Sequence, residues 1–260
     1  MSKIRVTFGM LVPLAVIAGV AGAARVTTSE LNHELYRELH KMPPAAALPS
    51  PETRACYERL GKIAQFTAIP IRVEPAQCAR FDIVRLDRIV MPDQKLVTVT
   101  PPPSLRCSMA EAVAEWVRDD VGPMAAELGA PVAAISGFDS YECRPRNNIR
   151  GATLSEHGKG NALDVGAVKL RNGATFSLTD PLVSRLFRER MRVAACARFS
   201  TVLGPGSDSY HNEHIHLDLA ERSNGYRICQ WNVLDPAAVA EVPLPRPRPM
   251  NLTADRTRSR

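Results

Sequence analysis

Two short segments of the sequence concentrate side chains that can bind a metal ion. The first covers residues 155–164 (SEHGKGNALD) and the second covers residues 210–218 (YHNEHIHLD). Together they hold four of the six histidines, namely His157, His211, His214 and His216. Imidazole and carboxylate groups are zinc ligands, and a catalytic zinc site keeps one of its four tetrahedral positions for water. The two segments therefore predict a metal centre.

The second segment has the alternation of a half-buried β-strand. In an extended chain, alternate side chains share a face. One face of residues 214–219 is apolar and can pack on a core, and the other carries His214, His216 and Asp218. A row of such groups is costly to bury unless a metal ion or a cleft uses it.

His157 and Asp164 in the first segment complete a plausible ligand set with His216. The two residues are seven positions apart, and Gly158 and Gly160 lie between them. Glycine permits the sharp backbone turn that would bring both side chains together. A His-x-His pair alone more often marks hydrogen-bonded histidines than a metal site, so the upstream pair is what favours a metal with water at its open position.

At these residues the sequence resembles the bacterial extensin-like C-terminal domain family. That family is in turn similar to zinc D-Ala-D-Ala carboxypeptidases and endopeptidases, whose signature is S-x-H-x(6)-D followed by H-x-H. The matching residues are Ser155, His157, Asp164, His214 and His216. The resemblance implies zinc on His157, Asp164 and His216, and an exported peptidase that cuts a D,D or L,D bond in peptidoglycan stem peptides. A non-catalytic zinc-binding cell-wall module of the same fold is the alternative.

The resemblance leaves the general base open between three residues. Some relatives place a glutamate three residues before the last ligand, which is Glu213 here, and others use an H-x-x-H-x-H run, which supplies His211 and His214. Strand parity puts His214 on the metal face and Glu213 on the other face, unless a bulge turns Glu213 inward. We rank Glu213 first, His214 second and His211 third, with a supporting hydrogen bond to a ligand as the alternative for each.

Arg144 and Ser155 are the candidates for binding substrate. Arg144 follows SGFDSYEC, near the place where the carboxypeptidases carry SGYR, whose arginine holds the substrate or the developing oxyanion. The spacing here is longer, so a surface arginine is the alternative. Ser155 either bonds the substrate or caps the turn before His157, and Asp218 is expected to orient His214 or His216.

The amino-terminal residues predict export. Lys3 and Arg5 precede an apolar run that ends on an A-x-A pattern, which is typical of a secretory signal over residues 1–24. An uncleaved anchor in the inner membrane is the alternative, since the run is long enough to span a bilayer. Either interpretation places the rest of the chain in the periplasm or cell envelope.

The six cysteines of an exported chain are expected to form disulfides. No pair has C-x-x-C spacing, which argues against a cysteine metal site. Fifteen pairings are open to six cysteines. We favour pairs of sequence neighbours, which are Cys56–Cys78, Cys107–Cys143 and Cys196–Cys229.

The formal charge of +6 does not indicate a nucleic-acid partner. Two of these charges lie in residues 1–24 and three in residues 241–260, so the body of the chain is nearly neutral. A basic groove would need clustered charge on the folded part. The partner that we expect is a peptidoglycan peptide.

The sequence predicts one α+β domain over residues 52–235, preceded by a linker over 25–51 and followed by a disordered Pro/Arg-rich tail over 236–260. We expect a small antiparallel sheet flanked by helices, with the zinc site on the sheet and disulfides stabilising the fold. The linker includes a weakly helical stretch at 26–42. The predicted strands are 81–90 and 95–99 as a hairpin, 131–138, 161–168 and 213–219. The predicted helices are 52–66, a helix that begins with a Ser108–Glu111 capping box and is bent or split at Pro123, and 180–198.

Overall fold

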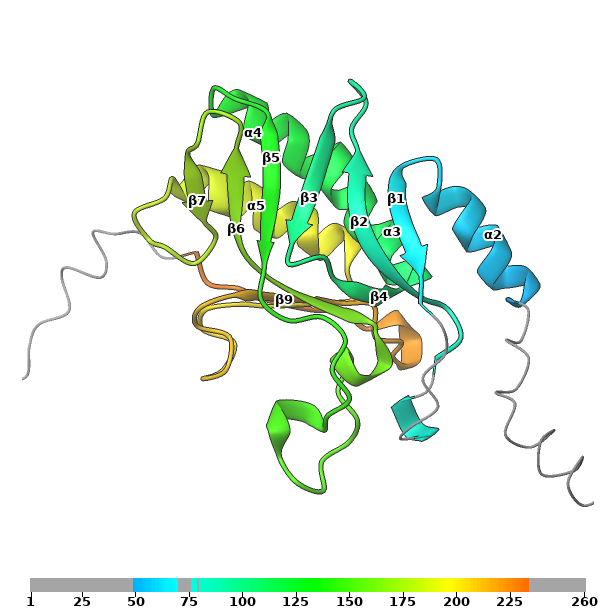
Figure 1. The fold of residues 1–260 in the computed structure, drawn as a ribbon. Coiled ribbons are helices and arrows are strands. Elements are labelled where there is room, and N and C mark those ends of the chain that lie inside the picture. Colours follow the sequence, from blue (N-terminus) through cyan, green and yellow to red (C-terminus); the bar gives the residue numbers. More distant parts are fainter. Residues whose placement is uncertain (1–48, 70–75, 79, 234–260) are drawn as a thin grey trace, which may run out of the picture. The chain divides into compact units, whose positions relative to one another are not determined.

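The structure is a computed structural model that describes residues 49–69, 76–78 and 80–233 (Figure 1). The expected signal or anchor, the helix over 26–42, most of the linker and the tail lie outside these residues. No helix within the described residues is both long and apolar enough to cross a membrane. All described residues belong to one compact unit, Leu48–Arg260.

A ten-stranded sheet forms the centre of the described fold. Its strands are β1 (Ala64–Ala68), β2 (Ile83–Val90), β3 (Leu96–Thr100), β4 (Ser104–Arg106), β5 (Val132–Gly137), β6 (Ala162–Leu170), β7 (Thr175–Ser177), β8 (Thr201–Leu203), β9 (Ile215–Asp218) and β10 (Ile228–Gln230). The order is β1-β2-β3-β5-β6-β9-β8-β10, with β4 beside β2 and β7 beside β6. The β3–β5 and β8–β10 pairs are parallel, and the other pairs are antiparallel.

The α+β class is confirmed, and the expectation of a small antiparallel sheet is wrong. All five predicted strands are present, and the 81–90 and 95–99 hairpin forms as β2 and β3. The sequence did not reveal β4, β7, β8 and β10, which have three residues each. A three-residue strand is too short to show a period-two pattern, and pairing with neighbours decides its conformation.

The helices are α2 (Pro51–Leu60), α3 (Cys107–Glu115), α4 (Gly122–Glu127) and α5 (Arg185–Arg198). Figure 1 shows α3, α4 and α5 on one face of the sheet, and α2 packs beside α3. The predicted helix 52–66 is too long. It ends at Leu60 before Gly61, and the residues that follow form β1 against β2 instead.

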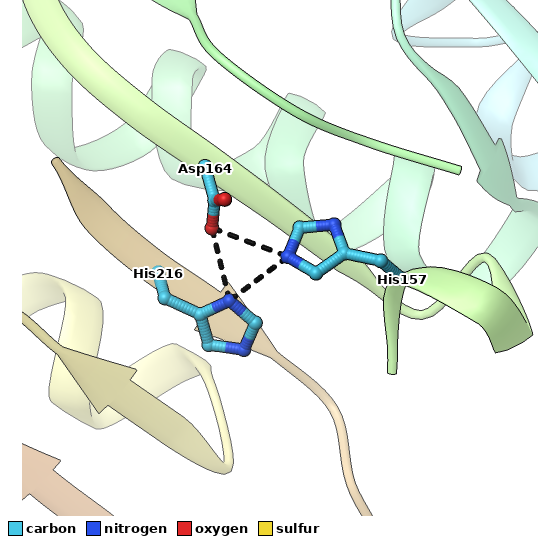
Figure 2. A group of neighbouring side chains, drawn as sticks. All are labelled: His157, Asp164 and His216. Carbon is cyan, nitrogen blue, oxygen red and sulfur yellow. Dashed lines mark hydrogen bonds and ion pairs between the residues drawn. The ribbon is translucent and has the colours of Figure 1, made fainter. Parts of the chain in front are cut away.

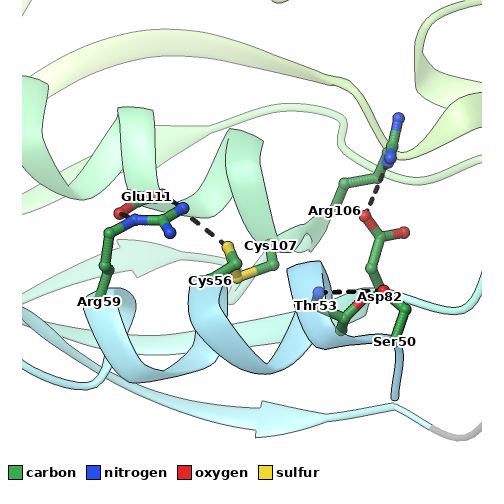
Figure 3. Close-up of a disulfide and its surroundings, with 8 residues drawn as sticks. All are labelled: Ser50, Thr53, Cys56, Arg59, Asp82, Arg106, Cys107 and Glu111. Atoms are coloured by element: carbon green, nitrogen blue, oxygen red, sulfur yellow. Dashed lines mark hydrogen bonds and ion pairs between the residues drawn. A yellow bond between two sulfur atoms is a disulfide. The ribbon is translucent and has the colours of Figure 1, made fainter.

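The helix after β4 begins differently from the prediction. Cys107 is its first residue, Ser108 lies inside its first turn and no side chain caps it, so the expected capping box is wrong. The Glu111 carboxylate instead accepts hydrogen bonds from Arg59 of α2 at 2.6 and 2.8 Å (Figure 3). Ahead of Pro123, a π-helical turn over Trp116–Val121 joins α3 to α4.

Helix α5 is shorter than predicted, and its buried face includes Phe187 and Met191. Ser184 caps it by accepting a hydrogen bond from the Phe187 N–H at 3.5 Å, so the helix starts at Arg185 and not at residue 180. Leu182 and Leu186, two apolar residues within the predicted range 180–198, are 82% and 70% exposed. The buried residues of the helix are Phe187, Arg188, Met191 and Ala195.

All six cysteines form disulfides, as expected of an exported protein. The Cys196–Cys229 pairing is confirmed. The other two predicted pairings are wrong, because Cys56 bonds Cys107 and Cys78 bonds Cys143. The packing of α2 along α3 brings Cys56 to Cys107 across a separation of 51 residues (Figure 3), and sequence proximity carries no information about such a contact.

Candidate metal centre

Strands β6 and β9 place two of the predicted ligands opposite each other. Asp164 on β6 pairs with His216 on β9, so their side chains leave the sheet on the same face. The neighbouring pair, Leu163 and Leu217, faces the core on the other side. The alternation read from the sequence is therefore confirmed, with a polar face over an apolar one.

The third predicted ligand, His157, lies on a 3₁₀ turn over His157–Lys159 that leads into β6. Gly160 ends this turn with φ +67°, in the left-handed region that favours glycine. A Cβ at Gly160 would stand 2.5 Å from Ile83 Cδ1, so the position is also sterically closed. Ser155 Oγ accepts a hydrogen bond from the His157 N–H at 3.3 Å, so Ser155 contacts the start of this turn.

The donor atoms of His157, Asp164 and His216 converge on one point (Figure 2). His216 Nδ1 lies 2.9 Å from Asp164 Oδ1 and 3.1 Å from His157 Nε2, and His157 Nε2 lies 3.3 Å from Asp164 Oδ1. Ligands of a tetrahedral ion at about 2.0 Å are about 3.3 Å apart. The three buried side chains therefore form a group that could hold a metal ion.

The far nitrogen of each imidazole is held by a further hydrogen bond. His157 Nδ1 donates to the backbone carbonyl of Ser140 at 2.6 Å, and His216 Nε2 donates to Asp218 Oδ2 at 3.1 Å. If each ring carries its proton on this far nitrogen, His157 Nε2 and His216 Nδ1 would present their lone pairs to a bound metal ion. Such outer hydrogen bonds are typical of metal-binding histidines.

Burial and charge act against each other in this group. Burial raises the pKa of Asp164, but hydrogen bonds from His157 and His216 outweigh it and hold the pKa well below its usual range. Burial lowers the pKa of His216, but bonds to Asp164 and Asp218 outweigh it and raise the pKa to about 9. Without a metal, His216 is therefore an imidazolium between two carboxylates, and a cation that binds here must displace its proton.

The group opens on a cavity of about 460 Å³. Its walls come from the strands β6, β8, β9 and β10, from the stretches 144–148 and 155–157, and from the loops on either side of β9. Predicted site residues in its lining are Arg144, Ser155, His157, Asp164, His211, His214 and His216. The structure thus brings together all but one of the site residues that the sequence predicted.

Glu213 is the exception. Its side chain is exposed and does not line the cavity, and the residue lies in the bend before β9, outside the strand predicted over 213–219. His214 faces the group instead, with Nε2 at 3.4 Å from Asp164 Oδ2. Burial lowers the pKa of His214, Asp164 opposes this and the neighbouring histidines add to the lowering. The structure therefore places His214, and not Glu213, beside the group.

The family comparison covers this whole site. The model of the family described as extensin-like protein C-terminus matches residues 54–230. The chain belongs to this family. No curated protein matches the sequence. The matched span contains each predicted site residue of the extensin-like domain, from Arg144 to His216.

Arg144 of the extensin-like domain lines the cavity, but its guanidinium is already paired. It donates to Asp139 at 2.8 Å and to Glu142 at 2.7 Å. Burial lowers the pKa of Arg144, and these two carboxylates outweigh it and raise the pKa. The positive charge of Arg144 in the cavity wall is therefore paired with carboxylates of the protein itself.

Sequence reasoning missed several residues that shape the extensin-like site. Asp208 accepts a hydrogen bond from His211 Nδ1 at 2.6 Å, and its position three residues before His211 was a signal that could have been used. Thr201 bonds Asp218, and the Ser140 carbonyl bonds His157. These last two contacts arise from strand pairing and loop packing, and no local sequence pattern predicts them.

Proposed function

We propose that the extensin-like domain is a zinc-dependent peptidase of the cell envelope that hydrolyses a D,D or L,D bond in peptidoglycan stem peptides. The observation that carries the proposal is the convergence of His157, Asp164 and His216 at the wall of an open cavity. Within the described residues, this group has three members and no fourth. Three protein ligands beside an open position are characteristic of catalytic zinc sites.

The donor set fits zinc in type as well as in spacing. Two imidazoles and one carboxylate are ligands that zinc accepts in a tetrahedral arrangement. Their order also matches the signature of zinc D-Ala-D-Ala carboxypeptidases and endopeptidases, S-x-H-x(6)-D followed by H-x-H, which supports a place near that superfamily. When bound, zinc supplies Lewis acidity, which lowers the pKa of a water and polarises a carbonyl.

His214 is the residue best placed to move the proton in this hydrolysis. Its Nε2 faces the metal group, and its lowered pKa leaves the ring neutral and able to accept a proton near pH 7. His214 would take a proton from the attacking water at Nε2 and return it to the amine that leaves when the C–N bond breaks. His211 packs edge-on against the His214 ring, with 5.4 Å between ring centroids, and Asp208 holds it in place.

Export supports the choice of a substrate in the envelope. The three disulfides are stable in an oxidising compartment, and the sequence of residues 1–24 predicts a signal or an anchor. Peptidoglycan is the peptide polymer of that compartment in bacteria.

The test is digestion of isolated peptidoglycan by purified protein, with separation of the muropeptides that are released. We expect new muropeptides with the wild type and zinc, and none with His157→Ala or His216→Ala. Arg150→Ala, on an exposed residue outside the cavity, is the matched control and should behave as the wild type. Identical muropeptide profiles for the wild type and His157→Ala would refute the proposed activity.

A further inference from the structure

The carboxylates around the cavity are all engaged with partners inside the protein. Asp164 and Asp218 bond His216, and Asp208 bonds His211. Glu156 accepts hydrogen bonds from Lys159 at 2.5 Å and from Asn161 at 2.7 Å. Each of these four carboxylates therefore has a hydrogen-bond donor inside the protein, which leaves the arginines of the wall as the candidate partners for an acidic ligand.

Two of the three arginines in the cavity wall have no carboxylate partner among the described residues. Arg144 is paired with Asp139 and Glu142. By contrast, no ion pair to a described residue joins Arg146 or Arg222. Arg146 is exposed at the cavity, and Arg222 bonds only the neutral oxygens of Ser200 and Thr201.

Arg222 is held close to the metal group by a chain of hydrogen bonds. Its Nη2 donates to Thr201 Oγ1 at 2.7 Å, Thr201 bonds Asp218, and Asp218 accepts from His216 Nε2 at 3.1 Å. These bonds use two of the five N–H donors of the guanidinium, so donors remain for a ligand in the cavity. A planar guanidinium binds a carboxylate through two parallel hydrogen bonds.

The geometry points to a carboxylate subsite formed by Arg146 and Arg222, which binds a free carboxylate of the substrate close to the scissile bond. The inference rests on the proposed function and narrows its substrate class to acidic peptides. A bound dication would add further positive charge to the same cavity and strengthen the attraction. The carboxylate is either that of the peptide's C-terminus or that of an acidic side chain next to the bond.

Binding to the metal-free protein tests the subsite independently of catalysis. The probes are Nα-acetyl-L-Lys-D-Ala-D-Ala as the free acid and as its C-terminal amide, titrated calorimetrically at low ionic strength. A second pair of peptide probes has an amidated C-terminus and an acidic side chain. The side-chain carboxylate is free in one probe and amidated in the other. We expect one of the two acids to bind about tenfold more tightly than its amide, as a charge-assisted pair implies.

Variants assign that preference to the two arginines. Arg146→Gln and Arg222→Gln should each reduce the preference for the acid several-fold, while Arg150→Gln, exposed and outside the cavity, should preserve it. The hydrogen bond from Arg222 to Thr201 is lost in Arg222→Gln, which could impair folding. Arg222→Lys keeps the positive charge and is the control for such a defect. Equal affinity for acid and amide in both pairs would overturn the subsite. An acid preference without hydrolysis by the zinc-loaded protein would uphold the subsite and reject the peptidase.

Discussion

Asp218 lies outside the candidate ligand set, but we expect it to affect metal binding through His216. It holds His216 by the nitrogen that faces away from the group. Asp218→Asn keeps the shape but removes the charge, and we expect it to weaken metal binding about 10–100-fold. Competition with a chromogenic chelator measures this, and Asp93→Asn, in an exposed surface turn, is the control. Unchanged affinity in Asp218→Asn would show that its role is only structural.

The choice between His214 and Glu213 is a second question at the scale of the residue. Because His214 faces the metal group and Glu213 is exposed, His214→Ala should lower kcat by about 10²–10⁴-fold, the range of a lost general base. Glu213→Ala should leave kcat within about twofold of the wild type. Steady-state hydrolysis of a stem peptide is the measurement. A large loss in Glu213→Ala alone would restore the order inferred from the sequence.

The three residues of the candidate metal centre could be predicted from the sequence because their signals are local. The spacing of His157 and Asp164 around two glycines, and the alternation around His216, are both properties of short segments. The base could not be ranked in this way, since a bulge that no pattern excludes would have reversed the parity of Glu213. The Ser140 carbonyl and Thr201 reach the site only through tertiary packing.

At the scale of the element, the turn at Gly160 positions His157. Ala at this site would meet both a left-handed φ and Ile83 Cδ1 at 2.5 Å. Gly173 has φ +90° but nothing within 4 Å of its Cβ position. We therefore expect Gly160→Ala to lower the free energy of unfolding by about 2–4 kcal/mol, and Gly173→Ala by only about 1 kcal/mol. Urea unfolding compares them, and equal losses would mean that the contact with Ile83 relaxes without cost.

Elements with strong periodicity were predictable, and short ones were not. The long strands β2 and β6 carry enough residues to show their pattern. The first three residues of β1 were assigned to a helix, because Gly61 alone did not indicate that the chain would reverse and pair with β2. In α5, the buried face includes Arg188, whose guanidinium donates to the carbonyls of Pro181 and Val183, and hydrophobic periodicity cannot anticipate a buried arginine.

At the scale of the whole molecule, the disulfides join elements that are distant in sequence. Cys56–Cys107 closes a loop of 51 residues between α2 and α3. Such a crosslink lowers the chain entropy of the unfolded state, which stabilises the folded protein by about 4 kcal/mol. Replacement of both cysteines by serine should lower the unfolding free energy by about 2–5 kcal/mol in urea. The same urea midpoint as the wild type would show that the Arg59–Glu111 bridge and the packing of α2 suffice.

The Cys78–Cys143 disulfide determines in which compartment the cavity wall is covalently anchored. Cys143 directly precedes Arg144, so this bond tethers the start of the wall segment that carries Arg146. In a reducing compartment both sulfurs are thiols, and the wall has no covalent anchor. The cavity wall would then be held less firmly at the site of synthesis than after oxidation. Limited proteolysis should accordingly cut residues 144–154 faster in a Cys78→Ala/Cys143→Ala variant, and equal cutting would show that the other contacts of the segment hold it without the disulfide.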